Sequence, residues 1–172
     1  MAGHEQVGLG AHYLEQALAD FEGIKKLGDK ALTQLDDADV NRQPDPESNS
    51  IAVIVKHLHG NMLSRWTDFL TTDGEKPNRM RDEEFEGELE SLAALQSLWE
   101  EGWQLVLSTV ASLSEADLLR TVTIREQPHT VLQAIQRQVS HYSSHVGQII
   151  YLAKLFRSDQ WNTLSIPKRK RG

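Results

Sequence analysis

The residues SIAVIVKHLHGNMLSRWTDF, at positions 50–69, give the first indication of the fold class. Apolar side chains recur there at steps of three and four residues, which places them along one side of an α-helix. Ser50 precedes the first of them and is a favourable N-cap residue, and Asp73-Gly74 is a turn signal. The pattern therefore predicts a helix that begins after Ser50 and ends near residues 71–74. Its apolar positions are Ile51, Ile54, Val55, Leu58, Met62, Trp66 and Phe69.

Three further segments show the same periodicity, at about residues 10–35, 91–113 and 131–157. Residues 36–49 are rich in acids and contain two prolines, so we expect a loop there. A short β-branched segment at residues 121–124, followed closely by a proline, predicts a small β-hairpin before the last helix. Four long helices predict an all-α fold, a four-helix bundle.

The length of the chain, 172 residues, suits one domain, and we expect residues 1–172 to form a single four-helix-bundle domain. The C-terminal tail, residues 160–172, carries Trp161 and Leu164, and we expect these side chains to pack on the bundle. The last residues of the tail are basic, and we expect them to be mobile.

Composition and charge exclude several classes of function. The chain has no cysteine, which excludes disulfides, thiolate metal sites and a cysteine nucleophile. The formal net charge is −7 although four positive charges lie together at residues 168–171, and so acidic a body argues against nucleic-acid binding. The apolar runs are far shorter than the roughly 20 residues that cross a bilayer, and the N-terminus lacks a secretory signal pattern. We therefore expect a cytoplasmic protein without nucleic-acid or membrane partners.

Two of the seven histidines have a spacing that suits a metal ion. His141 and His145 are four residues apart in the last predicted helix, so both imidazoles lie on one side of it, roughly 6 Å apart at Cβ. Val139, Tyr142 and Val146 flank the pair. Burial of two unpaired imidazoles among such residues is costly unless a metal ion engages them. The alternative interpretation is two ordinary polar helix positions.

The predicted helix at positions 50–69 offers a third ligand. His57 and His59 lie about 200° apart around its axis, so only one of them can face a shared site, and periodicity leaves the choice open. Three imidazoles suit zinc, nickel, iron or copper, and three protein ligands with an open position are typical of catalytic zinc. A di-iron bundle fits less well, because the one Glu-x-x-His, from Glu126 to His129, contains a proline.

Four stretches in combination resemble one known superfamily. They are NSIAVIVKHLHGNMLSRW at 49–66, FLTTDGEKP at 69–77, HYSSHVGQI at 141–149 and WNTLSIP at 161–167. Together they resemble the DinB-like, or YfiT-like, metal-binding four-helix bundles over nearly the whole chain, and most closely a branch of unknown function. The superfamily carries one metal-binding histidine on its second helix and two on its fourth. The resemblance therefore implies the ligands His57, His141 and His145, and favours His57 over His59.

The resemblance also implies a class of function. It implies a divalent metal ion, zinc or nickel, and a thiol-dependent S-transferase that uses a low-molecular-weight thiol such as bacillithiol, mycothiol or glutathione. It further implies a small-molecule substrate and a homodimer, and it assigns no catalytic residue. By their helical positions, Asn61 and Gln148 are candidate cofactor-binding groups. The alternatives are a non-catalytic metal-binding module of a stress response, and a metal-dependent hydrolase or isomerase with Glu100 or Glu101 as general base.

Overall fold

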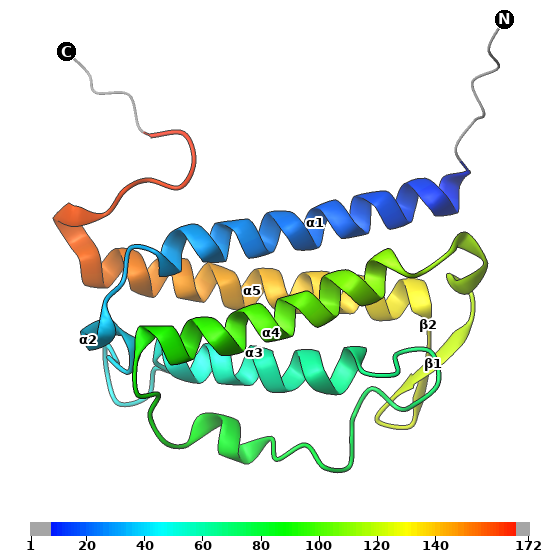
Figure 1. Cartoon of the computed structure of the whole chain (residues 1–172), viewed down its shortest axis with the longest axis horizontal. Helices are drawn as coiled ribbons and strands as arrows, with labels where there is room; N and C mark the ends of the chain where they lie inside the picture. Colours follow the sequence, from blue (N-terminus) through cyan, green and yellow to red (C-terminus); the bar gives the residue numbers. More distant parts are fainter. Residues whose placement is uncertain (1–7, 168–172) are drawn as a thin grey trace, which may run out of the picture.

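The computed structural model describes residues 8–167 and is mostly helical, which confirms the predicted all-α class (Figure 1). Four long helices dominate it: α1 (Leu9–Leu32), α3 (Ile51–Trp66), α4 (Leu92–Ala111) and α5 (Val131–Arg157). The shorter elements are α2 (Asp37–Val40), the hairpin strands β1 (Thr121–Ile124) and β2 (Gln127–Thr130), and the 3-10 turns η1 (Asp82–Phe85), η2 (Glu115–Asp117) and η3 (Ser158–Gln160). No helix in this part of the chain combines the length and the apolar character needed to cross a membrane.

Side-chain caps explain where the helices begin. The Ser50 hydroxyl accepts a hydrogen bond from the backbone N–H of Val53 at 3.2 Å, as its N-cap assignment predicts. Thr130 caps α5 in a reciprocal arrangement with Gln133. The end of α3 differs from the prediction, because Thr67 already has an extended backbone and the helix stops at Trp66.

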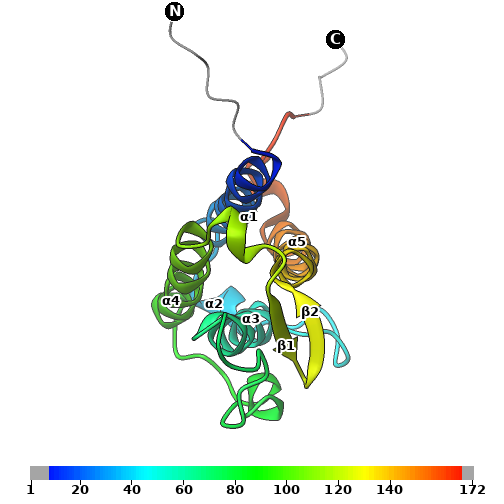
Figure 2. The ribbon, with the colours of Figure 1, turned by 90° about the vertical axis from the view of Figure 1, so that its right-hand side faces the viewer.

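The four long helices lie around a shared core, as the end-on view shows (Figure 2). α3 packs chiefly on α4, and α5 packs chiefly on α1, so the molecule consists of two helix pairs placed against each other (Figure 1). Aromatic rings fill the space between the pairs: Phe21 meets Trp66 edge-on at a centroid distance of 5.6 Å, and Trp103 meets Tyr142 at 5.6 Å. Such contacts contribute beyond the area that they bury.

The segments between the helices contain more structure than their sequences indicate. The expected loop at 36–49 contains α2, because Asp36 and Asp39 form a reciprocal capping box around one helical turn. Residues 67–91, which join α3 to α4, run along the outer side of α3 and include η1 (Figure 1).

The predicted β-hairpin is present and is fixed by a distant carboxylate. β1 and β2 pair antiparallel, and the turn residues Arg125 and Glu126 have positive φ angles of 53° and 62°. Asp73 accepts hydrogen bonds from the backbone N–H groups of both residues at 2.9 Å. These bonds hold two non-glycine residues in a conformation that costs each of them energy.

The C-terminal tail packs on the helices as far as the structure describes it. Trp161 and Leu164 lie against the core, which confirms that expectation, and Gln34 exchanges two hydrogen bonds with the backbone of Asn162. The basic residues 168–172, which we expected to be mobile, lie outside the described residues, as do residues 1–7.

Candidate metal centre

Three histidine side chains from two helices converge on one point. His57 lies in the middle of α3, and His141 and His145 lie one turn apart on α5. The Nε2 atom of His141 is 3.3 Å from Nε2 of His57 and 3.1 Å from Nε2 of His145. One ring nitrogen of each residue lies within 4.8 Å of the other two. The structure thus brings together the three histidines that the resemblance singled out.

Hydrogen bonds at the opposite edge of two rings indicate which nitrogen carries the proton. Nδ1 of His57 lies 2.9 Å from a carboxylate oxygen of Glu84, and Nδ1 of His145 lies 2.9 Å from the side-chain oxygen of Gln148. Both partners accept a hydrogen bond, so each Nδ1 donates, and the Nε2 lone pairs point toward His141. A single proton on Nε2 of His141 can satisfy only one of them. The arrangement therefore leaves unshared electron pairs facing each other.

Two of the separations between these nitrogen atoms fit a divalent metal ion. Zinc–nitrogen bonds of about 2.0–2.1 Å in a tetrahedral site separate the nitrogen atoms by about 3.3 Å. The Nε2 separations of 3.1 and 3.3 Å agree with that requirement. A cation at the centre of the three rings would also use the lone pairs that no proton can satisfy.

Burial favours the neutral imidazole, the form that metal binding requires, at His141 and His145. His57 is only 9% exposed, and His141 and His145 are partly buried. Burial and the neighbouring His145 and His57 lower the pKa of His141 to about 3. Burial also lowers the pKa of His145, against the opposing effect of its hydrogen bond with Gln148. Both rings are therefore neutral near pH 7.

A network of charged side chains, buried where it meets His57, supports this residue from the outer side of α3. Arg79 donates two hydrogen bonds to Glu84, from Nε to Oε1 at 2.7 Å and from Nη2 to Oε2 at 2.9 Å. Glu75 connects this pair to Arg65 and to Arg125 of the hairpin turn. Burial alone would raise the pKa of Glu84, but the bonds from His57 and Arg79 outweigh it and lower the pKa. The carboxylate next to His57 is therefore ionised.

Sequence comparison places the chain in a family. A family model described as a protein of unknown function (DUF1572) matches residues 8–170. The chain belongs to the DUF1572 family. No curated protein matches the chain. Because the description of the DUF1572 family names no activity, the functional argument depends on the geometry of the site itself.

The other predicted site residues of this DUF1572 protein have different surroundings. The side-chain oxygen of Asn61 accepts a hydrogen bond from the Tyr142 hydroxyl at 3.1 Å, so this oxygen is held in the core. Gln148 contacts the centre through His145. His59 points to the opposite side of α3, where its Nε2 lies 2.9 Å from a carboxylate oxygen of Glu101. The geometry therefore distinguishes His57 from His59, which the helical period alone does not.

The support provided by Glu84 and Arg79 was missed by the sequence reasoning. Residues 81–90 are acid-rich, and such a run of carboxylates in a sequence usually indicates a solvent-exposed loop or turn. η1 instead places Glu84 against α3, at 9% exposure. One available signal was Gly60 in the middle of a predicted helix, because a helical glycine often marks a close approach of another group.

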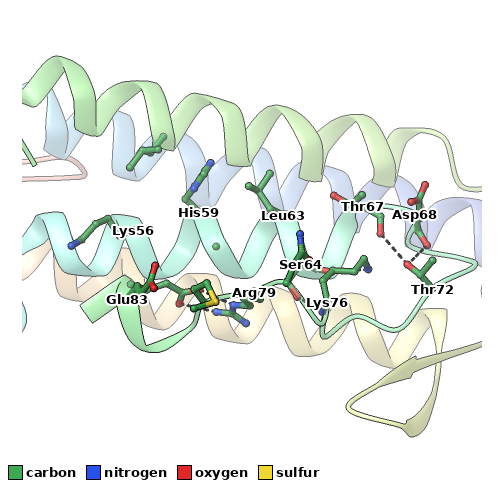
Figure 3. Close-up of a pocket in the computed structure, with 15 residues that line it drawn as sticks. Lys56, His59, Leu63, Ser64, Thr67, Asp68, Thr72, Lys76, Arg79 and Glu83 are labelled. Carbon is green, nitrogen blue, oxygen red and sulfur yellow. Dashed lines mark hydrogen bonds and ion pairs between the residues drawn. The ribbon is translucent and has the colours of Figure 1, made fainter. Parts of the chain in front are cut away.

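Two cavities lie near the centre, one on each side. A groove of about 630 Å³ includes Gln148, Ser144 and Tyr151 of α5 and the loop around Asn49. A second cavity, of about 680 Å³, lies between α3, α4 and the 72–84 segment; Figure 3 shows Lys56 and His59 in its wall. Glu84 and Arg79 also line this second cavity, so the ion pair separates it from His57.

Proposed function

We propose that this DUF1572 protein binds a divalent metal ion, zinc or nickel, through His57, His141 and His145. One observation carries the proposal: one ring nitrogen of each of three histidines from two helices lies within 4.8 Å of the other two, and Nε2 of His141 lies 3.3 and 3.1 Å from Nε2 of His57 and His145, separations that suit a shared ion. The hydrogen bonds from Nδ1 of His57 and His145 support it, because metal-binding imidazoles are commonly oriented by a partner at their second nitrogen.

We further propose that the fold is the DinB-like four-helix bundle. Two features of the chain support this assignment. The four long helices lie around one core. Counting these helices in chain order, the second contributes His57 and the fourth contributes His141 and His145. This is the arrangement of ligands that the resembled superfamily uses.

The chemistry that we propose is the transfer of a low-molecular-weight thiol to an electrophilic small molecule. A bound divalent ion lowers the pKa of a coordinated thiol and so raises the population of the thiolate nucleophile at neutral pH. The chain has no cysteine, so the thiol must come from outside. The groove beside Gln148 offers a route, since Gln148 both lines it and contacts His145.

The hydrolase or isomerase alternative receives less support from the structure. It requires a general base near the ion, and the acids suggested by the sequence were Glu100 and Glu101. Glu100 pairs with Lys25 at 2.9 Å, and Glu101 pairs with His59 at 2.9 Å. Both carboxylates are more than half exposed, and neither belongs to the cluster of His57, His141 and His145.

Elemental analysis of the purified protein tests metal binding. We expect stoichiometric zinc or nickel in the wild type and in His59→Ala, and its loss in His57→Ala, because only His57 belongs to the three-nitrogen set. A wild-type protein that remains metal-free after incubation with either ion and dialysis would contradict the proposal. Equal metal contents in the two variants would contradict the ligand assignment.

Thiol-conjugation assays test the activity. The metal-loaded protein is incubated with an electrophilic fluorogenic bimane and with bacillithiol, mycothiol or glutathione, with and without a chelator. We expect conjugation that the chelator abolishes. A fully loaded protein that conjugates none of these thiols but gains thermal stability from the ion would instead be a non-catalytic metal-binding module.

The proposed homodimer has its own measurement. Light scattering coupled to size-exclusion chromatography gives the molar mass directly, and we expect twice the chain mass of 19.4 kDa. A single-chain mass at all concentrations would reject the dimer without affecting the metal proposal.

A further inference from the structure

We propose that Gly60, Glu84 and Arg79 form a positioning unit that fixes His57 as a metal ligand. This inference rests on the proposed metal site and adds to it the residues that orient one of its three ligands. The unit joins the middle of α3 to η1, two segments that the sequence alone does not connect. Gly60 leaves a space beside the helix, the Glu84 carboxylate occupies this space, and the Arg79 guanidinium group holds the carboxylate in place.

Gly60 provides the space. A Cβ atom built at this position would lie 2.8 Å from Cδ of Glu84 and still closer to Oε1. Glycine is unfavourable in the middle of a helix, so its place on α3 calls for a structural reason. The reason here is the approach of the Glu84 carboxylate to the helix surface, one turn from His57.

Arg79 limits where the carboxylate can go. Its guanidinium group engages both oxygens of Glu84, at 2.7 and 2.9 Å, and its side chain is 5% exposed. With both oxygens held, Oε2 of Glu84 is directed at Nδ1 of His57 at 2.9 Å. A bidentate pair of this kind gives geometric specificity as well as attraction. The carboxylate therefore cannot make room for a Cβ without losing one of these bonds.

The bond to Glu84 fixes the ring of His57 in the form that a metal ion needs. Nδ1 carries the proton, the Nε2 lone pair faces His141, and an anionic acceptor makes the imidazole a stronger donor of electrons. His145 has a weaker partner, the neutral amide of Gln148, which lies at an exposed position. We therefore expect the partner of His57 to contribute more to metal affinity than the partner of His145.

The affinity for Co²⁺ and for Zn²⁺, measured by competition with a chromophoric chelator, tests this inference. We expect Gly60→Ala and Glu84→Gln each to weaken binding by about 10- to 100-fold, the range found when partners of metal ligands are replaced. The visible spectrum of the Co²⁺ protein should change as well, since the ring of His57 loses its fixed orientation. A merely structural role would not alter that spectrum.

Gly147→Ala is the matched control. Gly147 lies on α5 close to His145, and a Cβ there would meet no atom of residues 8–167 within 4 Å, so we expect unchanged affinity and an unchanged spectrum. A second comparison uses Glu84→Ala as the background. With the carboxylate removed, adding Gly60→Ala should cause no further loss, because the added methyl group no longer meets it.

The outcomes separate this inference from the metal proposal. If the wild type binds neither ion, the metal proposal fails and this inference fails with it. If the wild type binds and both Gly60→Ala and Glu84→Gln keep its affinity and spectrum, the metal site stands and the positioning unit is overturned. Equal losses from Gly60→Ala with and without Glu84 would also overturn it, since Gly60 would then act on the helix alone. Circular dichroism of the metal-free variants checks folding, and Glu84→Gln preserves the side-chain shape if Gly60→Ala does not fold.

Discussion

The two sides of α3 are both buried but are built from different chemistry. Toward the core it presents Leu58, Met62 and Trp66, each at most 1% exposed. On the adjoining side it presents His57 and Ser64, which contact polar groups from α5 and from residues 67–91. The first side gains its free energy from area removed from water, whereas the second requires a specific partner for each group. Loss of one partner on the polar side therefore disturbs the others, whereas the apolar side responds chiefly to lost volume.

The largest expected effect is on the apolar side. Trp66→Ala removes a buried ring and should lower the free energy of unfolding by about 3–5 kcal/mol. Trp66→Phe keeps most of the ring but loses the hydrogen bond from Nε1 to the Tyr142 hydroxyl at 2.9 Å, and should cost about 1 kcal/mol. Urea denaturation followed by circular dichroism measures both. Similar costs for the two substitutions would mean that the hydrogen bond, rather than the volume, dominates this side.

On the polar side of α3, a large loss of stability is expected when Glu84 keeps its charge but loses its partner Arg79. Arg79→Met leaves the Glu84 carboxylate buried and poorly paired, which should cost about 3 kcal/mol in the metal-free protein. Arg79→Met combined with Glu84→Gln removes both charges and should recover much of that loss. The same denaturation experiment in the presence of a chelator measures it. A double variant as unstable as the sum of its parts would show that the two residues act independently.

Gly28 of α1 allows the same comparison for a close contact that involves no charged group. A Cβ at Gly28 of α1 would lie within 2.5 Å of Cη2 of the Trp99 ring, so Gly28→Ala should destabilise the protein by about 1–3 kcal/mol through overpacking. Gly23 lies on the same helix, and a Cβ there would have no neighbour within 4 Å in the part of the chain that the structure describes, so Gly23→Ala should stabilise the protein by about 0.5–1 kcal/mol. Thermal melts of the two variants should shift in opposite directions, and shifts of the same sign would refute the tight contact with Trp99.

The smallest expected loss of stability is that of Asp73→Ala. Asp73 attaches residues 67–91, the segment that carries Arg79 and Glu84, to the β-hairpin turn. Burial alone would raise its pKa, but bonds from the backbone N–H groups of Glu75 and Glu126 outweigh it and hold the pKa below its usual range. A lowered pKa in the folded state adds stability above the unfolded pKa of about 3.9, and this stability is lost as the pH falls through the folded value. Asp73→Ala should cost about 1.5 kcal/mol at pH 7.

That cost should shrink as the pH is lowered below 4, because the carboxyl then takes up a proton in the unfolded wild type while it stays ionised in the folded protein. Unfolding measured in urea at pH 7, 4 and 3 gives the dependence. A difference between the wild type and Asp73→Ala that stays constant over this range would mean that the charge of Asp73 contributes nothing.

The difference between the apolar and the polar side of α3 also explains how much of the structure could be predicted from the sequence. The apolar side of α3 and the helix α5, whose bounds agree with the predicted residues 131–157, follow from periodicity and caps, which are local signals. His141 and His145 also share one helix, so their proximity is a local property. His57 was favoured over His59 only by the resemblance, since its partners lie on other elements.

Glu84 and Arg79, the residues that support His57, could not be predicted because they lie in an irregular segment, where the sequence shows no hydrophobic periodicity. Glu84 reaches His57 across 27 positions, through a segment whose acids look solvent-exposed in the sequence. Its placement depends on Arg79, on the absence of a side chain at Gly60 and on the course of residues 67–91 along α3. Each of these contacts depends on how distant segments pack together, and the types and spacing of neighbouring residues do not reveal it.

The three imidazoles also lie at the boundary between the two helix pairs, with His57 on the α3–α4 side and the others on the α1–α5 side. A tie between His57 and His141 joins positions 84 residues apart and closes the middle part of the chain, residues 57–141, into a ring. Because closing a long ring removes much of the freedom of the unfolded chain, an ion held there would act as a cross-link between the two helix pairs, in addition to their packing and to hydrogen bonds such as that from Nε1 of Trp66 to the Tyr142 hydroxyl. Stripping the ion should then let water reach this boundary, and amide hydrogens along α3 and α5 should exchange faster.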